Sequence, residues 1–458
     1  MRKMSAQTSR RLLLIVSLIL VAVIGCQILY SAGIVGNKEK GEEFPSAVGD
    51  LSKDGYTLTR TVILSRHSIR SPLSGNGSTL GTITPHEWFS WSSAPSELSL
   101  KGTVLETEMG EYFRKWMEKE GLIPENYIPG EGEVRIYSNS KQRTIATARC
   151  FASGLFPVGD VTVEHHGEYD TMDPVFNPVL TFMTDEYAQD IKKEIFDLYG
   201  EEFGLLGENF ALLDKVLDTE KSEAFAGGSF SGFTTDDIDF SFENGSEPRT
   251  TGSLKTGCQA ADALVLQLYE EKDPEAAAFG EKLSFTDWQK ISYIKDLYVD
   301  ALFSTPLVSV NVANPLLKEL YLEMTAEGRK ISFLCGHDSS LASVTAALGV
   351  AEYTLPSSVE QKTPIGSKLV FCRWENSSGE AFWSIDIVYQ TTQQLRDMPI
   401  LTPEAGPAVY PLILEGVMMN EDGMYREDAL FERFMEAIDA YDELMEKYAP
   451  ESGSEDAA

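Results

Sequence analysis

Cysteine is scarce in this 458-residue chain, and the spacing of its five cysteines excludes two common kinds of site. No two of them form a C-x-x-C pair, so neither a zinc site nor a thioredoxin-like redox motif is predicted. Cys335 and Cys372 lie in apolar, strand-like runs, where a reduced cysteine packs as a small hydrophobic side chain. One or two disulfides are the alternative for the cysteines of an exported chain.

Basic residues are scarce as well. Lys and Arg number 38 against 71 Asp and Glu, which gives a formal net charge of -33. No basic stripe or Arg-aromatic run is present that would neutralise a phosphate backbone, and we therefore expect no nucleic-acid partner. An anionic substrate would have to be bound by a local cluster of Arg and His set against the overall negative charge.

Internal repeats are absent from the body of the chain. With 43% hydrophobic and 24% charged residues, the composition is that of a globular protein, which excludes disorder throughout. The length suffices for two substantial cores, or for one core with a large insertion.

Residues 1–35 carry the features of an export or membrane-anchoring segment. Basic residues precede an apolar run from Leu12 to Ile24, as in the charged and hydrophobic regions of an export signal. Residues 23–26, Val-Ile-Gly-Cys, fit a bacterial lipobox, which predicts cleavage before Cys26 and lipidation of its thiol. Because apolar character continues to Val35, an uncleaved membrane-spanning helix is the alternative, followed by complete release. In each case we expect export to the periplasm or the outer face of the cell.

Shifts in composition divide the rest of the chain. Residues 36–54 predict a polar linker, and residues 450–458 predict a disordered tail. Strand-like and helical patterns alternate over residues 55–177 and 303–449, which predicts an α/β core with a mostly parallel sheet flanked by helices. Residues 178–302 are helical in pattern, split by a Gly/Ser/Asp-rich loop at 227–252, and predict a helical insertion (cap) domain.

The expected elements follow from the apolar periodicity. Strands are predicted at 56–68, 134–140, 330–338, 367–375 and 381–390, and helices at 99–120, 143–151, 186–198, 210–221, 257–271, 286–302, 340–348 and 428–448. Two of the five histidines, His67 and His337, end apolar strands and precede a polar loop or a helix. Open α/β sheets place ligand-binding groups at such strand ends.

Two arginines flank the first of these histidines in the run Ser-Arg-His-Ser-Ile-Arg-Ser-Pro, residues 65–72. The guanidinium groups of Arg66 and Arg70 could hold the non-bridging oxygens of a phosphoryl group while the imidazole of His67 attacks phosphorus in line. The alternative is a basic surface loop that forms ordinary salt bridges.

The second motif is Cys-Gly-His-Asp-Ser-Ser, residues 335–340, between a strand and a helix. His337 could bind phosphoryl oxygens, and Asp338 could protonate the departing alkoxide and then activate water. As a single residue, Asp338 is more typical of the N-cap of the following helix, and the two roles are compatible.

Together, RHSIRSP and GHDSS resemble the paired signature of the histidine acid phosphatases, branch 2 of the histidine phosphatase superfamily. Further stretches resemble the bacterial periplasmic glucose-1-phosphatases and phytases of that family, namely SRHSIRSPLSGNGSTL, YSNSKQRTIATA, TMDPVFNP, GSLKTG, TPIGSKLVF and QTTQQLRD. The resemblance covers residues 56–416. It implies a phosphoglycerate-mutase-like sheet with a helical insertion, and catalysis through a phosphohistidine without metal or cofactor.

The resemblance also assigns roles to residues. His67 becomes the nucleophile, Asp338 the proton donor, and the phosphate ligands are Arg66, Arg70, Arg143 and His337. Arg143 is identified only through the resemblance, since it otherwise has the pattern of an exposed helix residue. Because Asp338 must be protonated when substrate binds, the family implies an acidic pH optimum.

Three positions bear on specificity within the family. Ser68 stands where most members have Gly, which favours a sugar phosphate and a more crowded pocket. Ser340 stands where Asn is usual, which would affect the orientation of Asp338. Glu247 lies where an acidic gate over the pocket would come from, with a solvated loop carboxylate as the alternative.

Other acidic and histidine clusters are weaker candidates. His165 and His166 with Asp170 and Asp173 could be metal ligands, but adjacent side chains diverge on a strand, and we predict no metal. Asp236, Asp237 and Asp239 lack the spacing of a calcium loop and are expected to be solvated.

The sequence thus predicts an exported phosphomonoesterase whose preferred substrate is glucose 1-phosphate or a similar sugar phosphate. Inositol hexakisphosphate comes second, because phytases usually have a more basic pocket mouth. A phosphate transferase with a sugar acceptor is a further enzymatic alternative. A non-catalytic sugar-phosphate-binding lipoprotein is the alternative from another class, although it would be expected to lack His67 or Asp338. The expected partners are the small-molecule phosphomonoester and the membrane, and no oligomeric state is predicted.

Overall fold

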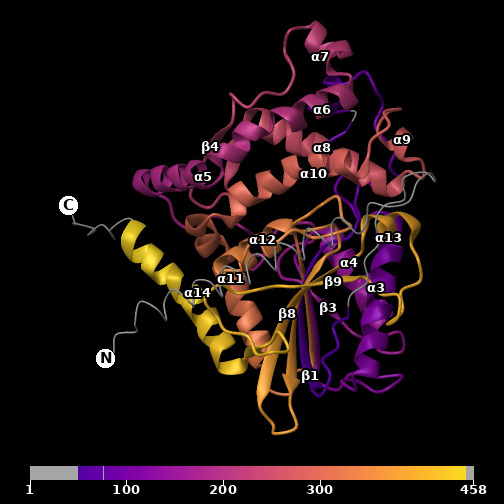
Figure 1. Ribbon diagram of the computed structural model, residues 1–458, viewed down its shortest axis with the longest axis vertical. Helices are drawn as coiled ribbons and strands as arrows, with labels where there is room; N and C mark the ends of the chain where they lie inside the picture. The colour runs from indigo at the N-terminus through magenta and orange to yellow at the C-terminus, as the bar shows by residue number, and fades with distance from the viewer. Residues whose placement is uncertain (1–49, 76, 450–458) are drawn as a thin grey trace, which may run out of the picture. The chain divides into compact units, whose positions relative to one another are not determined.

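The computed structural model of the protein describes residues 50–75 and 77–449 (Figure 1). The predicted export segment with Cys26, most of the predicted linker and the predicted tail lie outside these residues. Among the helices of the described ranges, none combines the length and apolar character needed to cross a bilayer.

A central eight-stranded sheet carries the fold. Its strands are β1 Thr57–Arg66, β2 Val134–Ser138, β3 Val163–Glu164, β6 Ile331–Gly336, β7 Lys368–Glu375, β8 Ala381–Tyr389, β9 Ala408–Pro411 and β10 Tyr425–Arg426. They follow the order β10-β8-β7-β1-β6-β2-β3, with β9 paired to β8. The pairs β1-β6, β6-β2 and β2-β3 are parallel, and β7 to β10 join through antiparallel pairs. The predicted α/β class is confirmed, and its parallel half contains the strands that lead into both histidine motifs.

The second half of strand β1 is buried on both faces, which explains its unbroken apolar run Val62–Leu64. Val62 and Leu64 pack into one hydrophobic cluster, and Ile63 packs into another on the opposite face. Successive side chains of a strand alternate between faces, so a strand covered by helices on both sides needs apolar residues throughout.

Helices cover both faces of the sheet (Figure 1). On one face lie α3 Leu100–Lys119 and α4 Gln142–Leu155, and on the other lie α11 Pro306–Thr325, α12 Asp338–Ala347 and α14 Glu427–Tyr448. The ring of Phe151 on α4 stacks on Phe333 of β6 with centroids 4.0 Å apart. Helices α3 and α4 approach so closely that a Cβ on Gly110 would lie 2.2 Å from the carbonyl oxygen of Phe151.

No helix is predicted from the sequence over α11, which contains Pro315 in its interior. A proline in a helix removes a backbone hydrogen bond and normally marks a helix end. Leu316, Leu317 and Leu320 are nevertheless buried in the cluster on the sheet, and most helical stability in proteins comes from such packing. Packing against the sheet therefore stabilises α11 as a helix in spite of the internal proline.

The helices between residues 178 and 302 lie beyond one end of the sheet, at the top of Figure 1. They are α5 Asp185–Leu205, α6 Gly207–Leu217, α7 Glu223–Ala226, α8 Gly252–Glu270, α9 Pro274–Ala277 and α10 Phe285–Val299, with short turns η1 Thr219–Lys221 and η2 Asp300–Ser304. The loop predicted at 227–252 contains a hairpin of β4 Asp239–Ser241 and β5 Arg249–Thr251. The apolar side chains of these helices share one cluster with Ile69 and Leu105, so both parts of the fold meet in a common core. Two short helices, α2 Thr79–Thr82 and α13 Thr392–Asp397, lie in connecting loops.

The carboxyl ends of β1, β2 and β6 meet at one edge of the sheet. The register aligns the last residues of β1 and β2 with those of β6. His67, Asn139 and His337 directly follow these three ends and therefore lie side by side.

A buried ion pair anchors the end of β1. Lys368 on β7 and Glu106 on α3 are almost completely buried, with Nζ 2.7 Å from Oε1. Burial raises the pKa of Glu106, and the charge of Lys368 opposes that rise. Lys368 also donates to Ser65 Oγ and to the Gly366 carbonyl oxygen, and Gly366 N donates to the carbonyl oxygen of His67. The turn that carries His67 is thus tied to the sheet.

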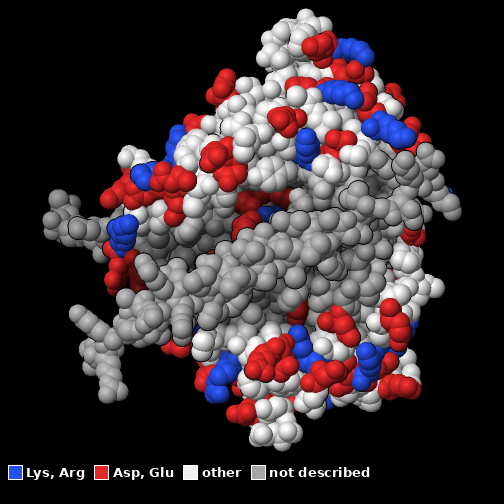
Figure 2. Space-filling view, in the orientation of Figure 1, with Lys and Arg blue, Asp and Glu red and all other residues white. Residues whose placement is uncertain are grey.

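Charge on the visible face agrees with the composition. Figure 2 shows Asp and Glu side chains spread over the described part of this face, with Lys and Arg between them singly or in small groups. A continuous basic stripe is not seen on that part, as expected for a net charge of -33.

Candidate active site

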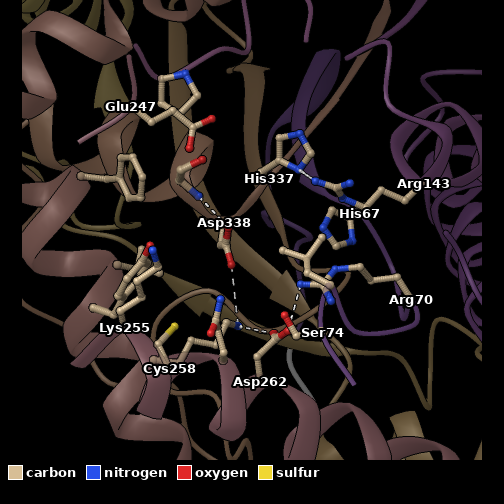
Figure 3. A pocket seen from close by; sticks show the side chains of 18 of the residues that line it. His67, Arg70, Ser74, Arg143, Glu247, Lys255, Cys258, Asp262, His337 and Asp338 are labelled. Carbon is tan, nitrogen blue, oxygen red and sulfur yellow. Dashed lines mark hydrogen bonds and ion pairs between the residues drawn. The ribbon is translucent and has the colours of Figure 1, made fainter. Parts of the chain in front are cut away.

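A cavity of about 260 Å³ at the strand ends brings the two predicted motifs together (Figure 3). Its walls include five of the predicted site residues outside the gate, His67, Arg70, Arg143, His337 and Asp338. Figure 3 shows Asp338 between the basic groups on one side and Glu247, Lys255 and Cys258 on the other. The apolar part of the wall includes Leu73, Met172, Pro178, Tyr298, Val299 and Phe303.

His67 is a neutral imidazole with one nitrogen free. Its Nδ1 lies 2.9 Å from the carbonyl oxygen of Ser68, and because a carbonyl only accepts, Nδ1 carries the proton. Burial, followed by the charge of Arg143 and of the other basic groups, holds the pKa of His67 well below its usual value. The lone pair of Nε2 is therefore available at acidic pH, as a nucleophile requires.

Arg66 lies behind the cavity and is fully buried. Its NH1 donates to Glu360 Oε1 at 2.7 Å and to the Thr363 carbonyl oxygen at 2.6 Å. Its NH2 lies 3.3 Å from Asp338 Oδ2. Nε and NH2 have no hydrogen-bond acceptor among the described residues, so this guanidinium keeps donors for a ligand.

Arg70 and Arg143 also keep unused donors. Arg70 NH2 donates to Asp262 Oδ2 at 3.0 Å, and Arg143 projects from the first turn of α4. The Nε groups of both are buried without an acceptor in the described part of the chain. Burial and the neighbouring charge of Arg70 lower the pKa of Arg143 to about 10, which leaves it charged at neutral and acidic pH. An oxyanion would supply the missing acceptors.

Asn139, which the sequence did not single out, orients His337. Its Oδ1 accepts from the backbone N of Ser140 and Asp173, so its Nδ2 points at His337 Nε2, 2.7 Å away. Burial and the charge of Arg143 lower the pKa of His337 well below its usual value, so the ring is neutral and its proton sits on Nδ1. Nδ1 lies 3.3 Å from Arg143 NH2, so the imidazole and this guanidinium lie side by side at the cavity wall.

The structure corrects the expectation that Asp338 is a helix N-cap. Helix α12 begins at Asp338, and His337 occupies the N-cap position. Ser340 Oγ accepts from His337 N at 3.2 Å, so the serine that stands in place of the usual Asn contacts the histidine backbone. Asp338 instead contributes a negative charge to the first helical turn, where the helix dipole favours it.

Asp338 is a carboxylate in this structure. Its Oδ2 lies between Arg66 NH2 at 3.3 Å and Lys295 Nζ at 3.7 Å. Burial raises the pKa of Asp338, but the charges of Arg66, Lys295 and the other basic groups outweigh it and hold the pKa well below its usual value. Protonation of Asp338 therefore requires that some of this positive charge be matched by a bound anion.

Three charged residues at the site are not predicted from the sequence. Lys295 on α10 and Asp262 on α8 line the cavity, and Glu360 lies behind it in the loop before β7. Each sits in an ordinary helical or loop pattern without a motif, so only their positions in the fold connect them with the histidines.

Glu247 lies at the cavity wall, in the loop between β4 and β5. Desolvation in the concave site raises the pKa of Glu247, and the nearby charge of Asp338 adds to the rise. The residue as a whole is exposed, so it stands at the mouth of the cavity.

The remaining sequence predictions can be placed as well. Cys335 and Cys372 are free and buried as predicted, and Cys150 and Cys258 are also free. In the described ranges no cluster of three His, Cys, Asp or Glu side chains is arranged to hold a metal ion. Asp173 instead accepts from the Tyr137 hydroxyl, and Asp236, Asp237 and Asp239 are exposed.

Comparisons with known proteins agree with this geometry. Residues 57–190 match the sequence model of the histidine phosphatase superfamily, branch 2. The chain is 34% identical over 415 residues to a glucose-1-phosphatase of Salmonella typhimurium (strain LT2), covering 89% of this chain and 95% of the relative. It is 34% identical to a glucose-1-phosphatase of Providencia rettgeri, over 83% of this chain and 91% of the relative. It is 26% identical to phytase AppA of Escherichia coli (strain K12), over 83% and 92%.

A solved structure shares the fold. The Hafnia alvei phytase in its apo form superposes with a TM-score of 0.78 at 24% identity, covering 85% of this chain and 99% of that chain. With the paired motifs, the convergent cavity and two relatives at 34% identity, this chain belongs to the histidine acid phosphatases, branch 2 of the histidine phosphatase superfamily.

Proposed function

We propose that this protein hydrolyses sugar phosphates, with glucose 1-phosphate or a close analogue preferred, through a phosphohistidine formed on His67. The observation that carries the proposal is the neutral imidazole of His67, with Nε2 free, among buried guanidinium donors that lack acceptors. This arrangement matches a nucleophile beside a site for phosphoryl oxygens.

In the bound state the non-bridging oxygens of the phosphate accept from Arg66, Arg70, Arg143 and His337 Nδ1. Glu360 holds Arg66, Asp262 holds Arg70 and Asn139 holds His337, so these three donors need little reorganisation when substrate enters. Preorganised, desolvated donors of this kind stabilise the negative charge of the transition state.

The chemistry then takes two displacements. His67 Nε2 forms a bond to phosphorus as the bond to the ester oxygen breaks, and Asp338 transfers its proton to the departing oxygen. In the second step Asp338 takes a proton from water as the water oxygen bonds to phosphorus and the P–N bond breaks. The sum is ester plus water to alcohol plus phosphate, with His67 and Asp338 restored. Ser68 supports the charged phosphohistidine ring, because its carbonyl oxygen accepts from Nδ1–H.

Substrate binding also prepares Asp338. A phosphate dianion beside Arg66 and Arg70 matches the charges that lower the pKa of Asp338, so that pKa rises on binding. Below the raised pKa the carboxyl group carries the proton that it donates, and above it the proton is lost. We therefore expect an acidic optimum.

The substrate preference is proposed from the acidic residues of the cavity wall and from the relatives that this chain resembles. Glu247 and Asp262 are acidic members of the wall, which disfavours a substrate with many phosphates. The relatives named glucose-1-phosphatase are more similar to this chain than the phytase of Escherichia coli, at 34% against 26% identity. Residues 178–302, proposed as a cap on the core of residues 55–177 and 303–449, supply both Glu247 and Asp262.

The direct test is phosphate release by residues 37–458 in EDTA, on glucose 1-phosphate and inositol hexakisphosphate separately. Release from glucose 1-phosphate at the higher kcat/KM supports the proposal. A preference for inositol hexakisphosphate would make the protein a phytase. Binding of glucose 1-phosphate without release from either substrate would show a non-catalytic binding protein.

Glu247 provides a specificity test of the same site. Glu247→Gln removes a negative charge at the mouth, and we expect kcat/KM for inositol hexakisphosphate to rise about tenfold relative to glucose 1-phosphate. This tenfold change in relative kcat/KM should become smaller with added salt, because salt screens exposed charges. The matched control is Glu243→Gln on the same hairpin, outside the cavity wall. An unchanged ratio in Glu247→Gln would rule out the gate.

Export and anchoring are proposed from the sequence alone, since residues 1–49 lie outside the described residues. Cleavage before Cys26 and lipidation of its thiol would place the enzyme on the outer side of a bacterial membrane. Labelling of the protein by radioactive fatty acid in bacterial cells should be lost in Cys26→Ser. A labelled Cys26→Ser protein, or an unlabelled wild type that keeps its N-terminus, would contradict lipidation there.

A further inference from the structure

One carboxylate oxygen joins two buried cations behind the cavity. Glu360 Oε1 lies 2.7 Å from Arg66 NH1 and 2.6 Å from Lys295 Nζ. The side chains of Glu360, Arg66 and Lys295 are 2%, 1% and 6% exposed, so this bridge is shielded from water. The Coulombic attraction between charges in the low-dielectric interior is stronger than that between the same charges at the surface.

The other oxygen of Glu360 is also held. Its Oε2 accepts from the Tyr269 hydroxyl and from Ile365 N, each at 3.0 Å. Burial raises the pKa of Glu360, but Lys295 and Arg66 outweigh it and bring the pKa to about 2. Glu360 is therefore a fixed, permanently charged group throughout the acidic range in which the enzyme is expected to work.

Both bridged cations reach the same oxygen of Asp338. Arg66 NH2 is 3.3 Å and Lys295 Nζ is 3.7 Å from Oδ2. Only Lys295 of these two cations lines the cavity. Because Lys295 is held by Glu360, we expect it to keep its place beside Asp338 when phosphate oxygens bind the guanidinium groups.

We propose that Lys295 is a positioning residue that, held by Glu360, fixes the carboxyl group of Asp338 and sets the pH below which this group carries its catalytic proton. The inference rests on the proposed function, since it assigns Asp338 the proton-donor role.

Charged and titratable groups surround Asp338 on every side. They are Arg66 and Arg70 at the end of β1, Arg143 on α4, Glu247 in the β4-β5 loop, Cys258 and Asp262 on α8, Lys295 and Tyr298 on α10, and His337 before α12. The three arginines and His337 are the proposed phosphate ligands. Lys295 is the remaining cation in close reach, and it can be replaced without removing a proposed phosphate ligand.

The two members of the bridge make opposite predictions. Lys295→Met removes a positive charge, so the pKa of Asp338 in the enzyme–substrate complex rises and the alkaline limb of the kcat profile moves to higher pH. Glu360→Gln removes the negative charge that offsets both cations, so the pKa of Asp338 falls and the limb moves to lower pH. A merely structural role would lower kcat at all pH values without moving the limb.

The experiment compares pH profiles of kcat and kcat/KM on glucose 1-phosphate for the wild type, Lys295→Met, Lys295→Arg and Glu360→Gln. We expect the limb to move up by about one pH unit in Lys295→Met, to return toward the wild-type position in Lys295→Arg, and to move down in Glu360→Gln. Lys255→Met is the matched control, because Lys255 also lines the cavity but, among the described residues, forms no ion pair with Asp338. Its limb should stay in place.

The outcomes distinguish failure of the inference about Lys295 from failure of the proposed function. An active wild type with an unmoved limb in folded Lys295→Met overturns the inference and leaves the proposed function intact. A limb that moves in the same direction in Lys295→Met and Glu360→Gln overturns it as well. If thermal unfolding shows that Lys295→Met is not folded, the direction of the shift in Glu360→Gln becomes the test. An alkaline limb that stays in place or moves to higher pH in Glu360→Gln would then contradict the inference. A wild type that releases no phosphate overturns the proposed function instead.

Discussion

Replacing His67 by alanine is expected to lower phosphate release from glucose 1-phosphate by at least about 10,000-fold. The variant loses the atom that attacks phosphorus, while Arg70, Arg143 and His337 still bind the phosphoryl oxygens. Binding should therefore survive, and the KM or the dissociation constant should change far less than kcat. Steady-state phosphate release in EDTA, together with binding of glucose 1-phosphate by calorimetry, measures both quantities.

The matched control for this prediction is His86→Ala. His86 lies outside the cavity wall, with Nε2 3.1 Å from Asp218 Oδ2 and its ring stacked on Phe279. It should keep nearly full activity. Phosphate release by His67→Ala within tenfold of the wild type would exclude a phosphohistidine at this position. Rapid-quench labelling with radioactive phosphate should show a phosphoenzyme in the wild type and none in His67→Ala.

Asp338→Asn is expected to lower hydrolysis of glucose 1-phosphate by about 100- to 10,000-fold. The amide cannot donate a proton to the sugar oxygen, and it cannot accept one from water in the second step. An aryl phosphate with an acidic leaving group needs no proton in the first step, so its phosphorylation of His67 should be much less affected. The phosphoenzyme should then accumulate, because its hydrolysis still needs Asp338.

Burst kinetics with an aryl phosphate test this directly. Asp338→Asn should give a burst of phenol close to one per active site, followed by slow turnover, and its alkaline limb should disappear. The control is Asp236→Asn on the exposed loop before β4, which should behave as the wild type. Equal losses on alkyl and aryl phosphates would assign Asp338 to phosphate binding and not to proton transfer.

The fold was predictable where local patterns agree with the tertiary environment. Strand β1 has the unbroken apolar run Val62–Leu64 because both of its faces are buried there, and this property is visible in the residues themselves. Helix α3 was predicted within one residue of its bounds, since its buried face repeats with helical periodicity. Helix α11 was not predicted, because Pro315 argues against a helix locally and only packing against the sheet overrides it.

The site was predictable in its motifs and incomplete in its supporting residues. His67 and His337 stand in short runs whose neighbours reveal their chemistry. Asn139, Lys295 and Glu360 stand in runs without such neighbours, and each acquires its role from a contact across the fold. Arg143 was found only through the family resemblance, and the structure places it in the cavity wall with a buried, unpartnered Nε.

The amino-acid sequence by itself determined the α/β class, the histidine acid phosphatase family and the proposed nucleophile, because the residues that carry this information are neighbours in the chain. Only the tertiary structure decided the charge state of the site. Nδ1 of His67 bears the proton because it faces a carbonyl oxygen, and Asp338 is ionised because Arg66 and Lys295 meet beside it. Protonation depends on distances and desolvation among groups from β1, α10 and α12, which are far apart in the sequence and adjacent only after folding.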